Sequence, residues 1–440
     1  MDKDTPGSKA RVTGSRVDGT QSPSPDVQKK KAAVRGQAPS GHHGVRNSAM
    51  REHSRSMVRV VGILVMACVI ALGVVNVLFP DLSLSERENR NLAQLEAPTL
   101  DSLADGSWFK DTSTWFSDQF VGRDSFMSMR STILRGLGQK ENNGVYFAKD
   151  GYLMQQPATP KDDAIVHTQK SINDFVAAYP DISHHVMIVP DAATVMPSWL
   201  PANAPVRDQG QDIAAFTGGL DGPVILDARS PLEDHVNEGV YYKTDHHWTS
   251  LGAYNVFLSN AGALGIDNPV EYTPYTVSAD FEGTLAAKSG DYDSHDKVDV
   301  YAPSSDVDYY VNYVNEKSQS TSVYNVEKLD HNDKYQVFFG GNHPLVTINT
   351  TSESGKTLLV FKDSYANSFV SFLVPYYSTI IMVDPRYYYD DLSQIIHNSM
   401  VTDTLFLYSY DTIATDTSLA DVLDDATASV NAADEPSSKS

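Results

Sequence analysis

Twenty consecutive residues without a charged side chain, Val60–Phe79, limit the possible structures of this chain more than any other stretch. A helix of that length, at about 1.5 Å rise per residue, spans roughly 30 Å, the thickness of the hydrocarbon core of a bilayer. Its one strongly polar side chain, Asn76, lies near the end of the run. The run therefore predicts a membrane-spanning helix, with a buried core helix as the alternative.

Charges of opposite sign lie on the two sides of this run. Residues 1–59 contain twelve Lys or Arg and five Asp or Glu, whereas the rest of the chain contains 22 and 51. By the positive-inside rule we expect a cytoplasmic N-terminus and an extracellular main part after Pro80. Because the apolar run is long and no small-residue cleavage site follows it, we expect an uncleaved signal-anchor. The acidic exterior argues against nucleic acid as a tight ligand.

Composition divides the chain into five parts. The one cysteine, Cys68, lies within the apolar run, so disulfides and thiol nucleophiles are excluded outside it. Aromatic and aliphatic residues occur at helical spacing from Trp108 to Leu137. The expected parts are a disordered basic cytoplasmic tail (1–56), a transmembrane signal-anchor (57–80), a connector with an N-terminal α+β part (81–161), an α/β domain (162–410) with a β-rich insertion (268–354), and an acidic flexible tail (411–440).

Strand and helix patterns alternate along residues 162–410. Continuous apolar strands separated by amphipathic helices predict a mainly parallel sheet covered on both faces. The expected helices are Asp162–Tyr179, Asp208–Phe216, Ser250–Leu264, Tyr365–Leu373 and Asp390–Asn398. The expected strands are His184–Pro190, Pro223–Asp227, Thr357–Phe361, Thr379–Asp384 and Thr404–Tyr408. The fold class is therefore α/β.

A polar turn after a buried strand, in the segment KTLLVFKDSYANSFVSFL, carries the first candidate catalytic residue. Ser364 follows the strand Thr357–Phe361, at the end where open α/β sheets place their ligands. A helix that begins there offers free backbone N–H groups suited to an oxyanion. Ser364 is a candidate nucleophile, and a helix-capping serine is the alternative.

Asp245 and His247, in the segment VYYKTDHHWTSLGAY, are the residue types that a serine nucleophile needs. A serine hydroxyl requires a base to take its proton and a carboxylate to orient that base. In a locally extended stretch, residues two apart project to the same side, so we expect His246 to point away. The order Asp, His, Ser is compatible with a triad, because triads are defined by geometry.

Two alternatives stay open for this turn. The letters DHH also form a metal-ligand motif in one group of phosphoesterases, which collect several ligands from separate strand ends. Here the strand-end acids Asp191 and Asp227 are single, and the acids near Asp291 lie in a loop-like run. We therefore expect neither a metal nor another cofactor. The other alternative is a structural turn in which Trp248 packs against the histidines.

The segments TDHHWTSLGAY, FKDSYANSFVSFL and TIIMVDPRYY resemble the DHHW protein family of Gram-positive bacteria. They are more distantly similar to the SGNH-type domains of the alginate O-acetylation proteins. SERENRNL, WFSDQFVGRD, NNGVYFAKDGYL and FFGGNHPLVTI support the match, which runs from about Ser85 to Tyr410. The histidine doublet departs from the alginate relatives, in which only the second position is histidine.

The resemblance implies an SGNH-hydrolase-like fold with three α/β/α layers in permuted order. It assigns Asp245 as the orienting carboxylate, His247 as the general base and Ser364 as the nucleophile. The oxyanion donors are expected to be the backbone N–H of Ser364 or Tyr365, with Asn342 as a further candidate. Candidate substrate-binding residues are Trp248, as packing or a sugar platform, and Arg386 and Tyr387, which follow a strand end. A surface salt-bridge partner is the alternative for Arg386.

These features together predict a membrane-anchored, extracytoplasmic O-acyltransferase or esterase that depends on serine. The expected partners are the membrane, a cell-surface glycan or wall polymer, and a separate membrane protein that supplies the acyl group. The first alternative is a non-catalytic envelope protein that binds glycan with the same fold. A metal-dependent phosphoesterase is the more remote alternative.

Overall fold

The computed structural model of the protein describes residues 43–85 and 90–434. The chain divides into two compact units, Met1–Ala71 and Leu72–Ser440. Helix α1 (His43–Leu78) contains a stretch, Ser56–Asn76, that is long and apolar enough to cross a membrane. The expected disordered tail lies outside the described residues up to position 42. Its remainder, 43–56, is helical and contains no proline and one glycine, Gly44.

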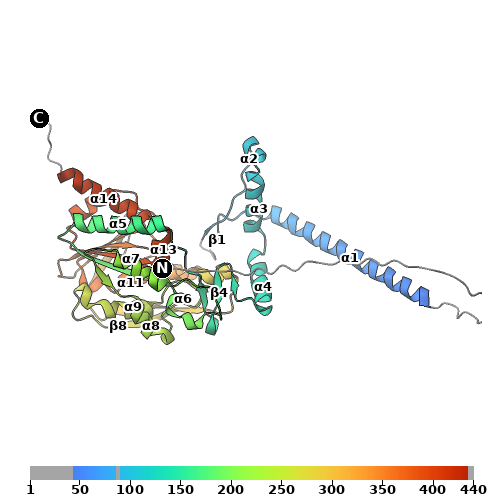
Figure 1. The fold of residues 1–440 in the computed structure, drawn as a ribbon, viewed down its shortest axis with the longest axis horizontal. Helices are drawn as coiled ribbons and strands as arrows, with labels where there is room; N and C mark the ends of the chain where they lie inside the picture. The colour runs from blue at the N-terminus through green and yellow to red at the C-terminus, as the bar shows by residue number, and fades with distance from the viewer. Residues whose placement is uncertain (1–42, 86–89, 435–440) are drawn as a thin grey trace, which may run out of the picture. The chain divides into compact units, whose positions relative to one another are not determined.

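An eight-stranded mixed sheet forms the centre of the second unit (Figure 1). In spatial order its strands are β11 (Ser318–Ser320), β10 (Tyr309–Tyr313), β12 (Leu345–Thr350), β14 (Thr379–Val383), β13 (Thr357–Lys362), β15 (Asp403–Ser409), β6 (Ser183–Val189) and β7 (Val224–Leu226). The five strands from β14 to β7 run parallel to one another. The other three pair antiparallel at the β14 side.

Both faces of the sheet are buried, as the alternating residues of β6 show. Met187 and Val189 belong to the core on one face, and Val186 and Ile188 to the core on the other. Helices α9 (Ser250–Asn260) and α11 (Ala366–Val370) supply Phe257 and Phe369 to the first core. Helices α5 (Asp162–Ala178) and α14 (Ser418–Asp434) lie side by side over the second core (Figure 1).

The predicted alternation of strands and helices is confirmed within one to three residues at most ends. Helix α11 is shorter than expected and ends at Val370. The further helices of this region are α6 (Ala192–Val195), α7 (Gln209–Gly218), α8 (Arg229–Asp234), α10 (Thr284–Ser289), α12 (Leu392–Ser399) and α13 (Tyr410–Thr415).

The region before residue 162 consists of small elements. They are β1 (Leu84–Ser85), β2 (Arg90–Asn91), α2 (Leu100–Ala104), α3 (Ser107–Gln119), α4 (Arg123–Gly136), β3 (Glu141–Asn142), β4 (Val145–Phe147) and β5 (Leu153–Gln155). Strands β3, β4 and β5 form an antiparallel sheet of three, at the Asn-Gly and Asp-Gly turns.

The segment 268–354 is β-rich, as expected, but it is only in part an insertion. Strands β8 (Tyr272–Phe281) and β9 (Asp296–Pro303) form a separate antiparallel pair. By contrast, β10, β11 and β12 extend the main sheet. Strand β12 alternates between buried and half-buried residues, the pattern of a strand in an antiparallel sheet.

The expected flexible tail at 411–440 is wrong over the described residues. The chain continues from β15 into α13 and then α14. Leu419, Leu423 and Ala426 of α14 are buried in the core beside Phe175 of α5. Their spacing of four and three residues places them on one helix face. The acidic composition hid this stripe, because the acids occupy the opposite face.

Candidate active site

A closed turn holds the DHH residues. Tyr241 and Trp248 form an isolated antiparallel bridge, and the Tyr242 N–H donates to the His247 carbonyl at 3.2 Å. The buried carboxylate of Asp296, the first residue of β9, accepts the Lys243 and Thr244 N–H groups, both at 2.8 Å. The turn is therefore bent, not extended as expected. The Asp296 carboxylate holds it in place through two backbone N–H groups.

Asp245 contacts His247 through the bend itself. Asp245 Oδ1 lies 2.6 Å from His247 Nδ1 and also accepts the His247 backbone N–H at 3.0 Å. Asp245 Oδ2 accepts the backbone N–H and the hydroxyl of Thr284, at 2.8 and 2.9 Å. Burial alone would raise the pKa of Asp245, but His246, His247 and these hydrogen bonds outweigh it and hold that pKa well below its usual range. Asp245 is therefore an ionised carboxylate, as an orienting residue must be.

Ser364 lies at the other end of the imidazole. His247 Nε2 is 2.7 Å from Ser364 Oγ. The side chains of Asp245 and His247 are 1% and 7% exposed, whereas Ser364 is only partly buried. The hydroxyl is therefore the accessible end of a buried hydrogen-bonded chain. The helix-capping alternative does not apply to Ser364, because its Oγ meets His247 and α11 begins two residues later.

Asp363, also buried, fixes the turn that carries Ser364. One of its oxygens accepts the Tyr365 N–H at 2.9 Å. The other accepts the Ser409 hydroxyl at 2.7 Å and the Thr412 hydroxyl at 2.8 Å, at the end of the neighbouring strand β15. The serine turn is thus attached to the end of β15 and to the first turn of α13.

Tyr335 joins the two turns. Its ring stacks on the His247 imidazole, with centroids 3.8 Å apart and planes 9° apart. Its hydroxyl donates to the Ser364 carbonyl at 3.0 Å. Because one residue contacts both His247 and Ser364, it restricts the rotation of the imidazole and the position of the serine together.

His246 does not point away from the site. Its ring lies 3.9 Å from that of His247, centroid to centroid, and its Nδ1 lies 2.8 Å from the Thr284 hydroxyl. Its side chain is 32% exposed. Partial burial, followed by the neighbouring His247, lowers the pKa of His246 to about 4, so its imidazole is neutral at pH 7.

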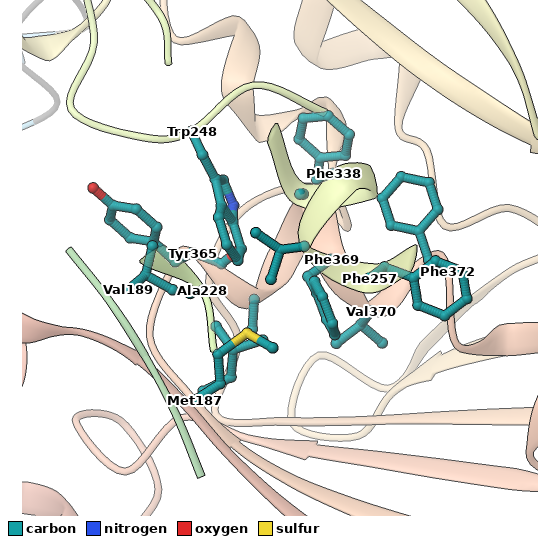
Figure 2. Close-up of a cluster of buried hydrophobic side chains, with 14 of the residues drawn as sticks. Met187, Val189, Ala228, Trp248, Phe257, Phe338, Tyr365, Phe369, Val370 and Phe372 are labelled. Carbon is teal, nitrogen blue, oxygen red and sulfur yellow. The ribbon is translucent and has the colours of Figure 1, made fainter. Parts of the chain in front are cut away.

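Trp248 is part of the core and not a sugar platform. Its side chain is completely buried, and its Nε1 donates to the Tyr365 carbonyl at 3.1 Å and to the Ser368 hydroxyl at 2.9 Å. Figure 2 shows its indole beside Tyr365, within the same cluster as Phe369. Trp248 thus links the DHH turn to the serine segment by packing, and no face of it is open to a substrate.

The two expected oxyanion donors on the backbone differ in their contacts. The Tyr365 N–H is engaged by Asp363, so it is not free to stabilise an oxyanion. The Ser364 N–H has no hydrogen-bond partner among the residues that the structure describes. The serine's own amide is therefore the better candidate.

Asn342 has a fixed orientation. Its Oδ1 accepts from Lys362 Nζ at 3.0 Å and from Asn367 Nδ2 at 3.1 Å. Lysine only donates, so the oxygen must face inward and the amide NH₂ must face the other way. Lys362 is itself buried beside Asp384, with 3.5 Å between the charged atoms. Asn342 is exposed and thus remains a candidate donor.

Within the described part of the chain, no hydrogen bond or ring contact joins Arg386 or Tyr387 to Asp245, His247 or Ser364. Arg386 makes a bidentate pair with Asp384, at 2.8 and 2.7 Å, and its guanidinium lies 5.4 Å from the centre of the Tyr387 ring. Arg386 therefore neutralises a completely buried carboxylate. Tyr387 is 46% exposed and accessible.

Asp245, His246 and His247 could in principle hold a metal ion, since one ligand atom from each lies within 4.8 Å of the others. Both oxygens of Asp245 and both ring nitrogens of His247 already have hydrogen-bond partners. A metal ion would have to separate His247 from Asp245 or from Ser364. The donor set thus fits an acid–base pair better than a metal centre.

Sequence reasoning found Asp245, His247 and Ser364 but missed the residues that hold them. Asp363 is adjacent to Ser364, and its position in the motif was an available signal. Thr284 and Asp296 lie 39 and 52 residues from their partners in the turn, and no local pattern marks them.

The comparisons with known proteins place the site within a family segment. Residues 229–383 match the DHHW protein family. No curated protein has a significantly similar sequence. A solved structure of a DHHW family protein from Eubacterium siraeum has a TM-score of 0.55 and 24% identity, covering 64% of this chain and 95% of its own. Bacillus cereus PatB1 with a sulfonyl adduct has a TM-score of 0.52 and 19% identity, covering 62% and 96%.

The O-acetyltransferase domain of Pseudomonas putida AlgJ is more distant, with a TM-score of 0.42 and 14% identity over 65% of this chain and 99% of its own. The structures of the Eubacterium siraeum protein and of PatB1 show the same α/β fold as this chain. The family match contains Asp245, His247 and Ser364. The resemblance of these motifs to the DHHW protein family is therefore confirmed over residues 229–383.

Proposed function

We propose that this protein is a serine-dependent O-acyltransferase or esterase, attached to the cell membrane and acting on a cell-surface glycan or wall polymer. The observation that carries the proposal is the continuous hydrogen-bonded chain from Asp245 through His247 to Ser364, with heavy-atom distances of 2.6 and 2.7 Å. A buried carboxylate, an imidazole and an accessible hydroxyl in this order are the parts of a nucleophilic triad. We also propose that the fold is of the SGNH-hydrolase type with its elements in permuted order.

In the first half of the reaction, Ser364 Oγ attacks the carbonyl carbon of an acyl donor while its proton passes to His247 Nε2. The tetrahedral intermediate collapses, the bond to the donor breaks, and the leaving group takes the proton from His247. Asp245, which accepts from His247 Nδ1, stabilises the imidazolium between these steps. The product is an acyl ester on Ser364.

In the second half, a sugar hydroxyl or water attacks that ester and gives its proton to His247. The Ser364–acyl bond breaks, and Ser364 recovers the proton. If a sugar hydroxyl is the acyl acceptor, the protein is a transferase. If water is the acceptor, it is an esterase. The Ser364 N–H and the outward amide of Asn342 are the proposed donors to the oxyanion in both halves.

The proposed location of the reaction is supported by the helix Ser56–Asn76 and by the charge distribution. A helix that can cross a membrane, with basic residues before it, favours a cytoplasmic N-terminus. The acidic second unit then lies outside the membrane, where an uncharged glycan is an acceptable partner. Over the residues that the structure describes there is one such helix. Because one span forms no channel, an acyl group from the cytoplasm requires a separate membrane protein as donor.

Turnover of an acetyl ester tests the proposal directly. We expect Ser364→Ala to abolish turnover with the fold intact, and EDTA to leave the unaltered protein active. Because a structure of PatB1 contains a sulfonyl adduct, a sulfonyl fluoride is a suitable second probe, and we expect it to modify Ser364. Activity that survives Ser364→Ala and is lost in EDTA would instead support a metal-dependent phosphoesterase. Glycan binding without turnover or sulfonylation would support the non-catalytic alternative.

A further inference from the structure

Helices α3 and α4 carry a row of apolar side chains on their solvent side, far along the chain from the triad. Phe109 and Phe116 are one heptad apart on α3, and Phe126, Met129 and Ile133 follow the helical spacing on α4. These five side chains are 45–61% exposed. We call them, together with Phe120, the apolar strip.

The strip is continuous across the connection between the two helices. The rings of Phe116 and Phe120 are 5.7 Å apart, and those of Phe120 and Phe126 are 5.4 Å apart. Helix α4 has a second, inner side where Ser131 is buried, so the exposed side is additional to the side that packs on the protein. A continuous exposed apolar surface marks a contact with a partner or a membrane.

Contacts within the second unit place this strip beside the end of the apolar helix. Asn76, the last residue of the stretch that can cross a membrane, accepts the Val121 N–H at 2.9 Å through its side chain. Asp81 accepts from the Trp115 indole at 2.7 Å. The α3–α4 connection therefore lies within one hydrogen bond of the point where the span ends, which is the level of the lipid headgroups.

We infer that the apolar strip of α3 and α4 lies in the outer membrane–water interface and contacts lipid. Amphipathic helices of this kind bury their apolar face at the boundary between headgroups and acyl chains, and aromatic side chains concentrate at that level. The inference rests on the membrane anchor of the proposed function and is independent of the catalytic triad.

Two fluorescence quenchers show what covers the strip: brominated lipid, which acts from within the bilayer, and iodide, which acts from water. The full chain is reconstituted in lipid vesicles with an environment-sensitive fluorophore on a single cysteine. The natural Cys68 reports the span. In a Cys68→Ser background, Ile133→Cys reports the strip and Val326→Cys is the matched control, an aliphatic residue that is 67% exposed outside it. Brominated lipid should quench the label at position 133 at least about twofold more than at 326.

The remaining outcomes contradict the inference in distinguishable ways. Quenching at Cys68 without quenching at 133 would leave the span intact and overturn lipid contact by the strip. Protection of position 133 from both brominated lipid and iodide would indicate that a second copy of the chain covers it. Absence of lipid quenching at both 68 and 133 would overturn the membrane anchor itself.

Discussion

His246 and His247 are neighbours in sequence and in space, but their nitrogens have different partners. His247 is bonded to Asp245 and Ser364, whereas His246 Nδ1 meets Thr284. We expect His247→Ala to lower acetyl-ester turnover by roughly a thousandfold or more, because the proton acceptor is lost. His246→Ala should keep turnover within roughly tenfold of the unaltered protein, because no proton-transfer step uses it. Equal losses in the two variants, with circular dichroism unchanged, would contradict this division.

Gly283 sets the position of Asp245 by its lack of a side chain. A Cβ at position 283 would lie 2.3 Å from the Asp245 Cβ and 2.7 Å from its Oδ2. We expect Gly283→Ala to displace the carboxylate and lower kcat by roughly a hundredfold, since triads depend on sub-ångström alignment. The matched control is Gly218→Ala in α7, where a Cβ has nothing within 4 Å. Equal kcat in the two variants would show that Asp245 tolerates the shift.

The residues of the hydrogen-bonded chain could be predicted from sequence, and most of those that hold them could not. Asp245, His247 and Ser364 lie in two short motifs that contain the residue types of a nucleophilic triad. Thr284 and Tyr335 contact them only because the chain folds back, which no local pattern encodes. For Trp248 both packing and a sugar platform were open, because an aromatic residue beside a polar turn suits a core or a sugar equally well. Burial alone decides between the two.

At the level of elements, periodicity predicted the parallel strands and their helices because both faces of the sheet are buried. The same criterion failed for α14, whose small buried residues, such as Ala426, give a weak apolar signal. It also failed to show that β10 and β12 extend the main sheet, since strand pairing depends on long-range contacts. A shared sheet and a separate insertion have the same local alternation.

One glutamine side chain connects two acidic residues at the N-termini of α6 and α13. Asp191, which precedes α6, is buried, and Asp411 lies in the first turn of α13. Gln209 bridges them, accepting the Asp191 N–H at 2.7 Å and donating to Asp411 at 3.1 Å. Burial first, then the charges of Asp411 and Asp363, raise the pKa of Asp191 well above its usual range.

This raised pKa makes stability depend on pH with a defined sign. The native state binds the Asp191 proton more tightly than the unfolded state, so its contribution is complete below the unfolded pKa of about 3.9 and is lost as pH rises through the folded pKa. Asp191→Asn retains the uncharged form, so its advantage in urea midpoint over the unaltered protein should grow from pH 4 to pH 8. The exposed Asp181→Asn should show no such growth. A pH-independent difference for Asp191→Asn would indicate that Asp191 is ionised throughout.

At the scale of the whole molecule, the separation of charge is the property from which topology is predicted. Basic residues within about 15–20 positions of a span set its orientation, and more distant ones contribute little. Counted from the apolar run Val60–Phe79, Arg51, Arg55 and Arg59 lie within that distance, as does Arg46, whereas Lys29, Lys30 and Lys31 do not. In intact protoplasts, added protease should therefore degrade a C-terminal epitope and spare an N-terminal one.

Charge reversal at these two sets then separates the positive-inside effect from net charge. Replacing Arg51, Arg55 and Arg59 by glutamate should expose the N-terminal epitope in a measurable fraction of molecules, because the bias next to the span is removed. Replacing the three lysines by glutamate changes the total charge by the same amount and should leave the epitope protected. Exposure of the N-terminal epitope in the unaltered protein would reverse the predicted topology and place the triad on the cytoplasmic side, where a wall polymer could not be its substrate.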